Sequence, residues 1–475
     1  MMRPLLLRVL LMVCGLLAIA ADDTGSPAPP PLSNPVISSH AFAPFGTVHV
    51  ARPPGAPRGV VLFLSDAQGI TAREEAVADA LARRGLLVAL VSTPALLAHA
   101  DDWSKRCLNA NYPLVDLSND VQHRMGVRAY MKPIIMGQGM GGTLAYATLS
   151  QWANGSYTGA VSLGYLPALA APKSWCTAPG FSAEPIGTGK DWRFGPNRRI
   201  RLPWVALYTR AQAPAVEPLV RGVPHARAVA LPGDTDRWPD LVARTAEGLL
   251  PRPPAPAQAG SLPIPDMPLT IVPPARTGAN GDLMAILYSG DGGWVGIDRD
   301  VAGQLAAAGI PVVGVDSLAY FWTARTPAGA GADLRQLIDA FSRHWHRPRV
   351  LLVGYSFGAD ALPHMVAHLD PATRAKLVRL SLLGLSGTAD FQFHLSSWLD
   401  ISADNALPTI PAITRLRGLP MQCVRGEDES DSACPEIPGG LAAQFLVPGG
   451  HHFDRNAALL AQIILDHRRP GTVSE

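Results

Sequence analysis

The sequence has almost no excess of charge of either sign. Lysine and arginine together number 40 and aspartate and glutamate 38, so the formal net charge is +2. Because proteins that bind nucleic acid usually carry a basic excess, this balance gives no case for a nucleic-acid partner. Cysteine is also scarce, with five residues and no CxxC pair. The adjacent histidines His451 and His452 lack the i, i+4 spacing of a helical metal site, so the sequence predicts no metal and no other cofactor.

No apolar run in the chain reaches the roughly 20 residues that a membrane-spanning helix needs. The apolar run near the N-terminus, residues 9–17, follows Arg3 and Arg8 and precedes the small residues at 18–20. This arrangement is typical of a cleaved signal peptide. We therefore expect residues 1–21 to be removed, the mature protein to reside in the periplasm, and residues 22–45 to form a flexible lead-in.

A Pro/Ala-rich stretch at residues 251–266 divides the chain and is typical of a semi-stiff linker. On each side of it, apolar strands alternate with amphipathic helices in the same order. Such alternation predicts a mostly parallel sheet covered by helices on both faces. The sequence therefore predicts an α/β fold with two tandem units, at residues 46–250 and 267–470.

Four cysteines would remain after removal of the signal peptide, and an even number favours disulfides in an oxidising compartment. Four cysteines allow three pairings. Pairing within each unit favours Cys107–Cys176 and Cys423–Cys434. The second bond would close a short loop and stabilise the fold by roughly 2–4 kcal/mol.

The centre of the second unit is a Gly-x-Ser-x-Gly segment at residues 354–358. An apolar run at 350–353 enters it, and apolar residues at helical spacing follow from 361 to 369. This strand–turn–helix context is that of a nucleophile elbow, so the sequence predicts two α/β-hydrolase-like units with Ser356 as the nucleophile of the second. The corresponding turn of the first unit has Gly139 in place of the serine, and its late segment at 230–234 has no histidine. We expect the first unit to be degenerate and inactive.

A serine hydroxyl needs an adjacent base, which follows late in the chain in α/β-hydrolases. His451 follows a strand and a Gly-Gly turn, and we prefer it to its neighbour His452. The acid should lie in the loop at 426–434, which contains four carboxylates. Glu429 has the usual spacing, whereas Asp431 lies nearer the expected disulfide. The residues do not separate these two, and Asp428 ranks third.

An oxyanion hole needs two N–H donors, each typically worth roughly 3 kcal/mol in the transition state. One should be the Phe357 amide, directly after the nucleophile. The other should come from the glycine-rich loop around Gly290 and Asp291. This loop lacks the Lys-Ser/Thr of a phosphate-binding P-loop.

Several of these segments together resemble the VirJ family of bacterial virulence proteins. The matching segments lie at 288–294 (YSGDGGW), 309–322, 354–358, 431–434 and 448–453 (PGGHHF). The two-unit layout is similar to AcvB, a longer relative. The resemblance implies a periplasmic α/β-hydrolase in which Ser356 is the nucleophile and His451 the base. For AcvB-like members it also implies hydrolysis of the aminoacyl ester of lysyl-phosphatidylglycerol, and VirJ-like members are linked to type IV secretion.

The leading hypothesis is a serine esterase that acts on an aminoacylated phospholipid at the periplasmic face of the inner membrane. The alternatives are a non-catalytic accessory protein, which would interact with type IV secretion components, and a hydrolase of small esters. A further hypothesis makes residues 391–399 a lid whose aromatic side chains enter the headgroup layer, with an acid among Asp390, Asp400 and Asp404 meeting a lysyl ammonium. Packing of the same aromatic side chains on the core is the competing interpretation.

Overall fold

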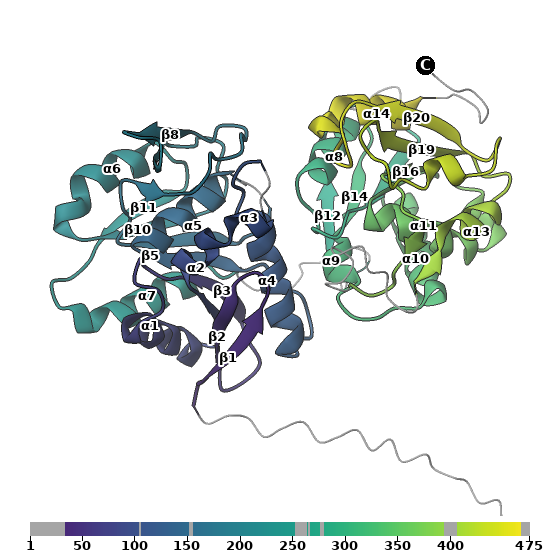
Figure 1. Ribbon diagram of the computed structural model, residues 1–475. Helices are drawn as coiled ribbons and strands as arrows, with labels where there is room; N and C mark the ends of the chain where they lie inside the picture. The colour runs from purple at the N-terminus through teal and green to yellow at the C-terminus, as the bar shows by residue number, and fades with distance from the viewer. Residues whose placement is uncertain are drawn as a thin grey trace, which may run out of the picture.

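The computed structural model describes residues 34–103, 106–151, 155–251, 264, 267–275, 280–393 and 406–466. They form two units, each a mostly parallel sheet between layers of helices (Figure 1). The predicted signal peptide, most of the predicted linker and residues 394–399 of the predicted lid lie outside the described residues, as do Asp400 and Asp404 beside it. Within the described part of the chain, no helix has the length and apolar character to cross a membrane.

The first unit contains an eight-stranded sheet in the order β1-β2-β4-β3-β5-β6-β10-β11. β1 and β2 are antiparallel to their neighbours and the other strands run parallel. The strands are β1 (Val36–Phe42), β2 (Gly46–Arg52), β4 (Leu86–Val91), β3 (Gly59–Leu64), β5 (Ile134–Gln138), β6 (Gly159–Leu163), β10 (Trp204–Tyr208) and β11 (Ala226–Ala230). The prediction of a flexible lead-in up to residue 45 is therefore wrong from β1 onward. Three consecutive polar residues, Ser38, Ser39 and His40, interrupt this edge strand, so it lacks the apolar run that marks the inner strands.

The second unit repeats this order without the outermost strand. Its seven-stranded sheet has the order β12-β14-β13-β15-β16-β19-β20, and β12 alone is antiparallel. The strands are β12 (Leu269–Val272), β14 (Val312–Val315), β13 (Leu283–Tyr288), β15 (Arg349–Tyr355), β16 (Leu377–Leu383), β19 (Met421–Gly426) and β20 (Ala443–Val447). Both sheets have the strand order of an α/β-hydrolase, so the predicted fold class is confirmed.

Helices cover both faces of each sheet. In the first unit they are α1 (Ala72–Arg83), α2 (Thr93–Ala98), α3 (Ala100–Trp103), α4 (Asn111–Arg124), α5 (Met140–Gln151), α6 (Ala213–Arg221) and α7 (Trp238–Glu247). In the second they are α8 (Ile297–Ala307), α9 (Ser317–Tyr320), α10 (Pro327–Trp345), α11 (Phe357–Ala367), α12 (Pro371–Arg374), α13 (Thr409–Thr414) and α14 (Ala457–Leu465). Short strands form two small accessory sheets, β7 (Leu169–Ala170), β9 (Asp191–Phe194) and β8 (Ala183–Ile186), and β17 (Thr388–Ala389) with β18 (Leu407–Pro408).

Strand β13 shows how each sheet supplies two cores. Its alternate residues Met284, Ile286 and Tyr288 pack with α10 and α11, and Leu283 and Leu287 pack with α8 and α14 on the other face. Side chains of a strand alternate between faces, so a strand that is buried throughout reads as one continuous apolar run. This burial explains why the inner strands could be predicted from the sequence.

Two disulfides form in the predicted pairs. Cys107–Cys176 fixes the segment before α4 in the first unit, and Cys423–Cys434 joins β19 to the end of the acidic loop in the second. The second bond spans only 11 residues of sequence, so it holds the acidic loop against the sheet edge.

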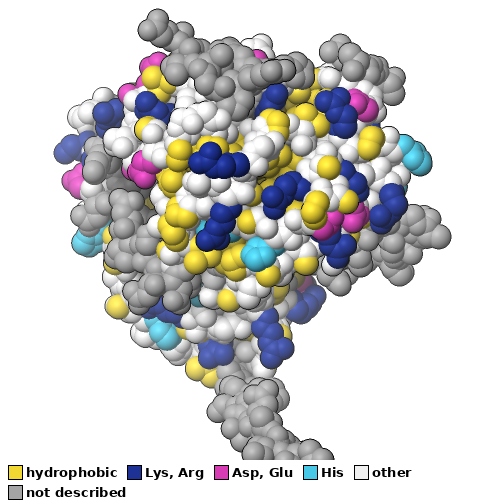
Figure 2. Space-filling model, turned by 90° about the vertical axis from the view of Figure 1, so that its right-hand side faces the viewer, with side chains coloured by type: hydrophobic (Ala, Val, Ile, Leu, Met, Phe, Trp, Pro, Cys, Tyr) yellow, Lys and Arg dark blue, Asp and Glu magenta, His cyan; other side chains and the backbone are white. Residues whose placement is uncertain are grey.

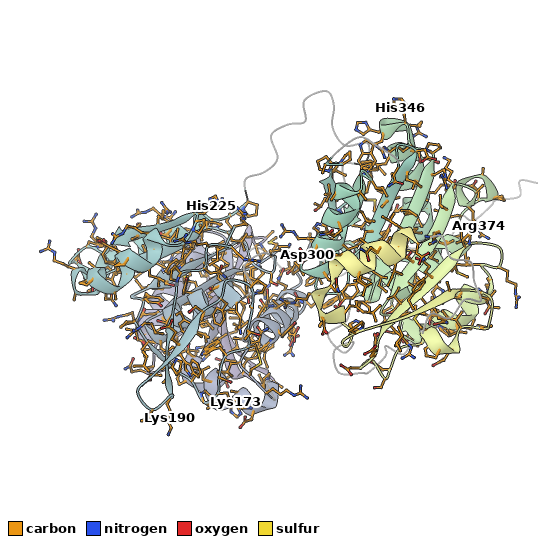
Figure 3. All side chains as sticks on the ribbon, turned by 90° about the horizontal axis from the view of Figure 1, so that it is seen from above. Lys173, Lys190, His225, Asp300, His346 and Arg374 are labelled. Carbon is orange, nitrogen blue, oxygen red and sulfur yellow. A yellow bond between two sulfur atoms is a disulfide. The ribbon has the colours of Figure 1, made fainter. Side chains whose placement is uncertain are left out.

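The two units are in contact through the ring of Trp322, which is 3% exposed. Its Nε1 donates to the Val127 carbonyl at 2.8 Å, and its ring stacks on His123 with centroids 3.8 Å apart. Phe393, 2% exposed, lies in the same cluster. Phe393 is thus packed between the units, as the competing interpretation of the lid segment holds. Figures 1 and 3 show α4 of the first unit and α8 of the second, with Asp300, on the sides that face each other.

The opposite face of the second unit has a different character. Figure 2 shows hydrophobic side chains on this face with Lys and Arg side chains spread among them and fewer acidic ones.

Candidate active site

Ser356 lies on a strained turn between β15 and α11. Its backbone has φ 51° and ψ −119°, a left-handed conformation that L-residues other than glycine rarely adopt. Glycines are required on both sides. A Cβ at Gly354 would lie 2.5 Å from the Gly358 carbonyl oxygen, and one at Gly358 would lie 2.4 Å from the Tyr288 carbonyl oxygen. The turn therefore holds the serine at the carboxyl edge of the sheet, as the Gly-x-Ser-x-Gly spacing predicts.

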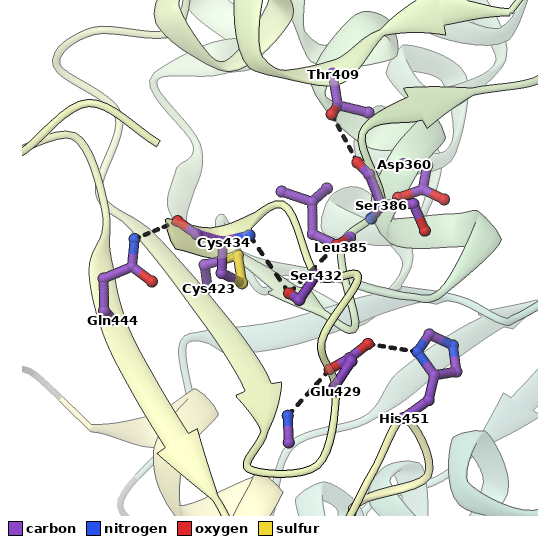
Figure 4. The surroundings of a disulfide bond; sticks show 11 residues. Asp360, Leu385, Ser386, Thr409, Cys423, Glu429, Ser432, Cys434, Gln444 and His451 are labelled. Atoms are coloured by element: carbon purple, nitrogen blue, oxygen red, sulfur yellow. Dashed lines mark hydrogen bonds and ion pairs between the residues drawn. A yellow bond between two sulfur atoms is a disulfide. The ribbon is translucent and has the colours of Figure 1, made fainter. Parts of the chain in front are cut away.

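His451 brings the serine and an acid together. Its Nε2 lies 2.9 Å from Ser356 Oγ, and its Nδ1 lies 2.5 Å from Glu429 Oε1. Glu429 is 6% exposed, and its second oxygen accepts from the Gly426 amide at 3.0 Å (Figure 4). An Nδ1–H donated to Glu429 leaves Nε2 as the acceptor for the serine proton. These side chains have the geometry of a Ser-His-acid triad.

The structure separates the acids between which the sequence leaves a choice. Asp428 and Asp431 are exposed, whereas Glu429 is the buried carboxylate next to His451. Asp431 lines the same cavity as Ser356. A tight turn explains why Glu429, and not its neighbours, reaches His451. The Glu429 amide donates to the Gly426 carbonyl at 3.2 Å, and this turn directs the Glu429 side chain inward.

His452 turns away from the serine. Its Nδ1 lies 2.6 Å from Tyr355 Oη, the hydroxyl of the residue before the nucleophile. Burial raises the pKa of Tyr355 well above its ordinary value, so the phenol keeps its proton. The hydroxyl therefore donates a hydrogen bond to the imidazole of His452. The three residues Phe453, Asp454 and Arg455 follow with φ of 50°, 47° and 58°, a left-handed turn that fixes where the histidine pair leaves β20.

The pKa of His451 reflects its neighbours. Partial burial, the largest single effect, would lower this pKa, but the Glu429 carboxylate, with help from Asp291 and Asp360, raises it above the ordinary value of 6.5. A general base acts only when it is unprotonated.

We therefore expect kcat/KM for an uncharged ester to fall as the pH is lowered, with a midpoint above pH 6.5, because protonation of His451 removes the base. The measurement is kcat/KM between pH 5 and pH 9, which reports groups of the free enzyme. A midpoint below pH 6 would contradict the raised pKa.

The loop after β13 approaches the nucleophile. A Cβ on Gly290 would lie 3.2 Å from Tyr355 Cδ1 and 3.5 Å from Ser356 Cβ, so the loop runs directly beside the nucleophile. Ser289 Oγ holds the loop by donating to the Gly290 carbonyl at 3.1 Å and accepting from the Ser317 amide at 2.9 Å. Phe357 begins α11, and the first amides of a helix have no intrahelical acceptor. The predicted oxyanion-hole segments thus lie on either side of Ser356.

A cavity of about 340 Å³ opens above these residues. Both units line it, because Tyr112 at the start of α4 joins the residues of the second unit. The lining residues are Tyr112, Gly290, Asp291, Gly292, Gly293, Val295, Gly296, Ile297, Asp298, Tyr355, Ser356, Ser386, Asp431, His451, His452 and Arg455. Among the described residues, no cluster of three or more His, Cys, Asp or Glu side chains could hold a metal ion.

Three residues around the site were not anticipated from the sequence. Tyr112 comes from a unit that appeared to lack any function, and Tyr355 is hidden inside the Gly-x-Ser-x-Gly motif. Asp360, one turn into α11, accepts from the Ser386 amide at 2.7 Å, and burial raises its pKa to about 8. An acid in an otherwise apolar helix directly after the nucleophile is a signal that could have identified Asp360.

The first unit retains the shape of the elbow with different chemistry. Gly139 has φ 52°, close to the 51° of Ser356. Asp66, which follows Ser65 as Gly290 follows Ser289, accepts from the Met140 amide at 2.9 Å. A Cβ at Gly139 would lie 2.2 Å from the Asp66 carboxylate. A fixed anion thus occupies the place next to the elbow amide, where the second unit has a glycine.

Comparison with known proteins finds a family model that matches the second unit. Residues 282–470 match the family model described as VirJ, bacterial virulence protein. No curated protein matches the chain. Similar solved structures include a dienelactone hydrolase from Anabaena variabilis, with a TM-score of 0.31 and 16% identity, covering 46% of this chain and 97% of that chain. The esterase domain of a Rhodothermus marinus protein has a TM-score of 0.30 and 15% identity, covering 44% of this chain and 95% of that chain.

With TM-scores this low, the fold assignment rests on the strand order of the two sheets. The family match covers the candidate active site. Ser356, Glu429 and His451 all lie inside the matched range, as does the glycine-rich loop beside them. Over residues 282–470 the chain is therefore similar to the VirJ family of bacterial virulence proteins.

Proposed function

We propose that this protein is an exported serine hydrolase that cleaves the aminoacyl ester of an aminoacylated phosphatidylglycerol. The observation that carries the hydrolase assignment is the continuous set of contacts from Ser356 through His451 to the buried Glu429. A scaffold protein has no need to keep a serine in a strained conformation beside an oriented imidazole.

The reaction would proceed in two steps. Ser356 Oγ attacks the ester carbonyl carbon while His451 Nε2 takes the hydroxyl proton, and the Phe357 amide donates to the oxyanion. Collapse breaks the bond to the glycerol oxygen, which leaves with the proton from His451. Water then attacks the acyl-enzyme with His451 again as base, which releases the amino acid and restores the serine. Glu429 holds the imidazole in the required tautomer throughout.

The phospholipid substrate follows from the resemblance to AcvB-like proteins, and two features support it. Export would bring the enzyme to the outer leaflet of the inner membrane, and the two disulfides suit an oxidising compartment. The outer face of the second unit combines basic and hydrophobic side chains (Figure 2), a composition that suits the surface of an anionic bilayer.

The test uses mature protein with lysyl-phosphatidylglycerol in mixed micelles. We expect free lysine and phosphatidylglycerol as products, separated by thin-layer chromatography, with no release of fatty acid. The Ser356→Ala variant provides the blank for spontaneous hydrolysis. Release of fatty acid would indicate a phospholipase instead. Turnover of small esters without turnover of the lipid would favour the small-ester hydrolase.

An accessory role in type IV secretion is the alternative from another class of function. It predicts that Ser356→Ala restores every phenotype of a deletion strain as well as the native chain does. The oriented triad favours the enzyme, because such a role does not require a reactive serine.

A further inference from the structure

One corner of the active-site cavity carries a carboxylate that the triad does not use. Asp298, in the first turn of α8, lines the cavity but is itself only 3% exposed. Its Oδ1 has no hydrogen-bond partner among the described residues. The carboxyl group accepts from the Gly290 amide, but Oδ1 does not share in this bond. Because a buried polar atom without a partner is unfavourable, this oxygen calls for a reason.

Other acids surround the same corner. Asp291, on the loop beside Ser356, also lines the cavity, and its charge acts on both Asp298 and Asp116. Asp116 belongs to α4 of the first unit, and its buried Oδ1 is likewise without a hydrogen-bond partner among the described residues. Burial, followed by the charge of Asp291, raises the pKa of Asp116 to about 7. Two elements from different units therefore direct negative charge toward one place.

The cations near the cavity have acidic or phenolic partners other than Asp298 and Asp291. Arg455 lines the cavity and interacts with Tyr112, and Lys132 is close to Asp316, which caps α9. Each of these cations has its own acidic or phenolic neighbour. Asp298, which lines the cavity and has an oxygen without a partner among the described residues, is left to meet a group that enters with the substrate.

We infer that Asp298 and Asp291 form a subsite for the ammonium group of a cationic acyl substrate, so that the enzyme selects esters of amino acids with a free amine. Asp116 of the first unit does not line the cavity and would act on this subsite only at longer range, through its charge. This inference rests on the proposed function and adds its selectivity. An ammonium can satisfy several carboxylate oxygens at once and neutralises their mutual repulsion. The loop from Gly290 to Asp291 places the subsite beside the reacting carbonyl, where the acyl half of the ester must lie.

The subsite also gives the first unit a role. That unit has no nucleophile at its elbow, yet its α4 brings Tyr112 to the cavity of the second unit. The contact between Trp322 and Val127 holds α4 in this position, since both α4 and Val127 belong to the same segment of the first unit.

The test compares two esters of similar length and different charge, lysine methyl ester and N-acetyl-norleucine methyl ester, at pH 8 with Ser356→Ala as the blank. The native protein should prefer the cationic ester. Asp298→Asn should reduce the ratio of the two kcat/KM values at least tenfold, and Asp116→Asn about threefold. Asn fills the same volume and can still accept from the Gly290 amide, so a loss in the ratio reports the carboxyl group and not its bulk.

Asp300→Asn is the matched control, because Asp300 is an exposed acid on the same helix and does not line the cavity (Figure 3). It should leave the ratio within twofold of the native value. If Asp298→Asn lowered kcat/KM equally for both esters, Asp298 would only support the loop, and the subsite would be overturned. A native protein without preference for the cationic ester would overturn it as well.

Calorimetric binding of lysinamide separates this inference from the proposed function, because it needs no turnover. Binding to the native chain that is lost in Asp298→Asn supports the subsite even if no ester is hydrolysed. Equal binding to both proteins, or to neither, rejects it even if Ser356 proves to be a working nucleophile.

Discussion

Replacement of Ser356 by alanine should reduce kcat/KM for any ester substrate by a factor on the order of 10⁶, to the level left by binding and the oxyanion hole. The reason is that Ser356 Oγ is the one group whose proton His451 Nε2 is placed to accept, at 2.9 Å. The same change should abolish covalent labelling by a fluorophosphonate, which reacts only with an activated serine. Intact-mass measurement after labelling reports both the loss of label in Ser356→Ala and the number of labelled sites in the native protein.

Ser430→Ala is the matched control for this experiment. Ser430 is an exposed serine beside Glu429 and outside the cavity, so its removal should leave labelling unchanged. Labelling that persists in Ser356→Ala would assign the nucleophile to another residue. The native chain should take up one equivalent only, because Gly139 stands at the elbow of the first unit.

Replacement of Glu429 by glutamine should lower kcat by roughly 10³ to 10⁴. Glutamine keeps the volume and can still accept from the Gly426 amide, so the loop should stay folded. It no longer presents a carboxylate to His451 Nδ1, and the imidazole loses both its tautomer and the stabilisation of its charged form. Since Glu429 raises the pKa of His451, the acid limb of the residual activity should also move to lower pH.

Asp428→Asn provides the comparison for Glu429→Gln. Asp428 is exposed in the same loop, and its charge can be removed with an effect of less than about threefold. Thermal unfolding of each variant checks that the loop is intact. If Asp431→Asn lowered kcat as much as Glu429→Gln, the acid of the triad would be Asp431. The contact between Glu429 and His451 would then be structural.

The nucleophile and the base could be predicted from the sequence because each lies in a local pattern. Ser356 has its strand, turn and helix within about twenty residues, and His451 follows the last strand directly. The acid could not be chosen in the same way. Four carboxylates share its loop, and what distinguishes Glu429 is a turn closed on Gly426 and burial against the sheet edge, which neighbouring residues in the sequence do not encode.

Two helices show where the sequence reading of the fold falls short. Helix α10 begins at Pro327 although Gly329 and Gly331 lower the helix propensity of its first turns, so its start is hard to predict from the sequence. Gly331 is needed there, since a Cβ would lie 2.8 Å from the Met365 carbonyl oxygen of α11. Helix α4 escaped prediction because many of its buried positions are polar, including Ser118 and Gln122. Its contribution to the cavity depends on contacts between the units and could not be predicted.

The Asp66 carboxylate has a consequence for any attempt to revive the first unit. A serine introduced at Gly139 would collide with that carboxylate, and a scissile carbonyl brought there would meet a negative charge where it needs a donor. Installing the hydroxyl alone would therefore yield an inert protein, and adding a histidine would not help until Asp66 was also exchanged. Several independent positions thus keep the first unit inactive. Substitutions on the surface that faces the second unit would not restore a reaction in the first.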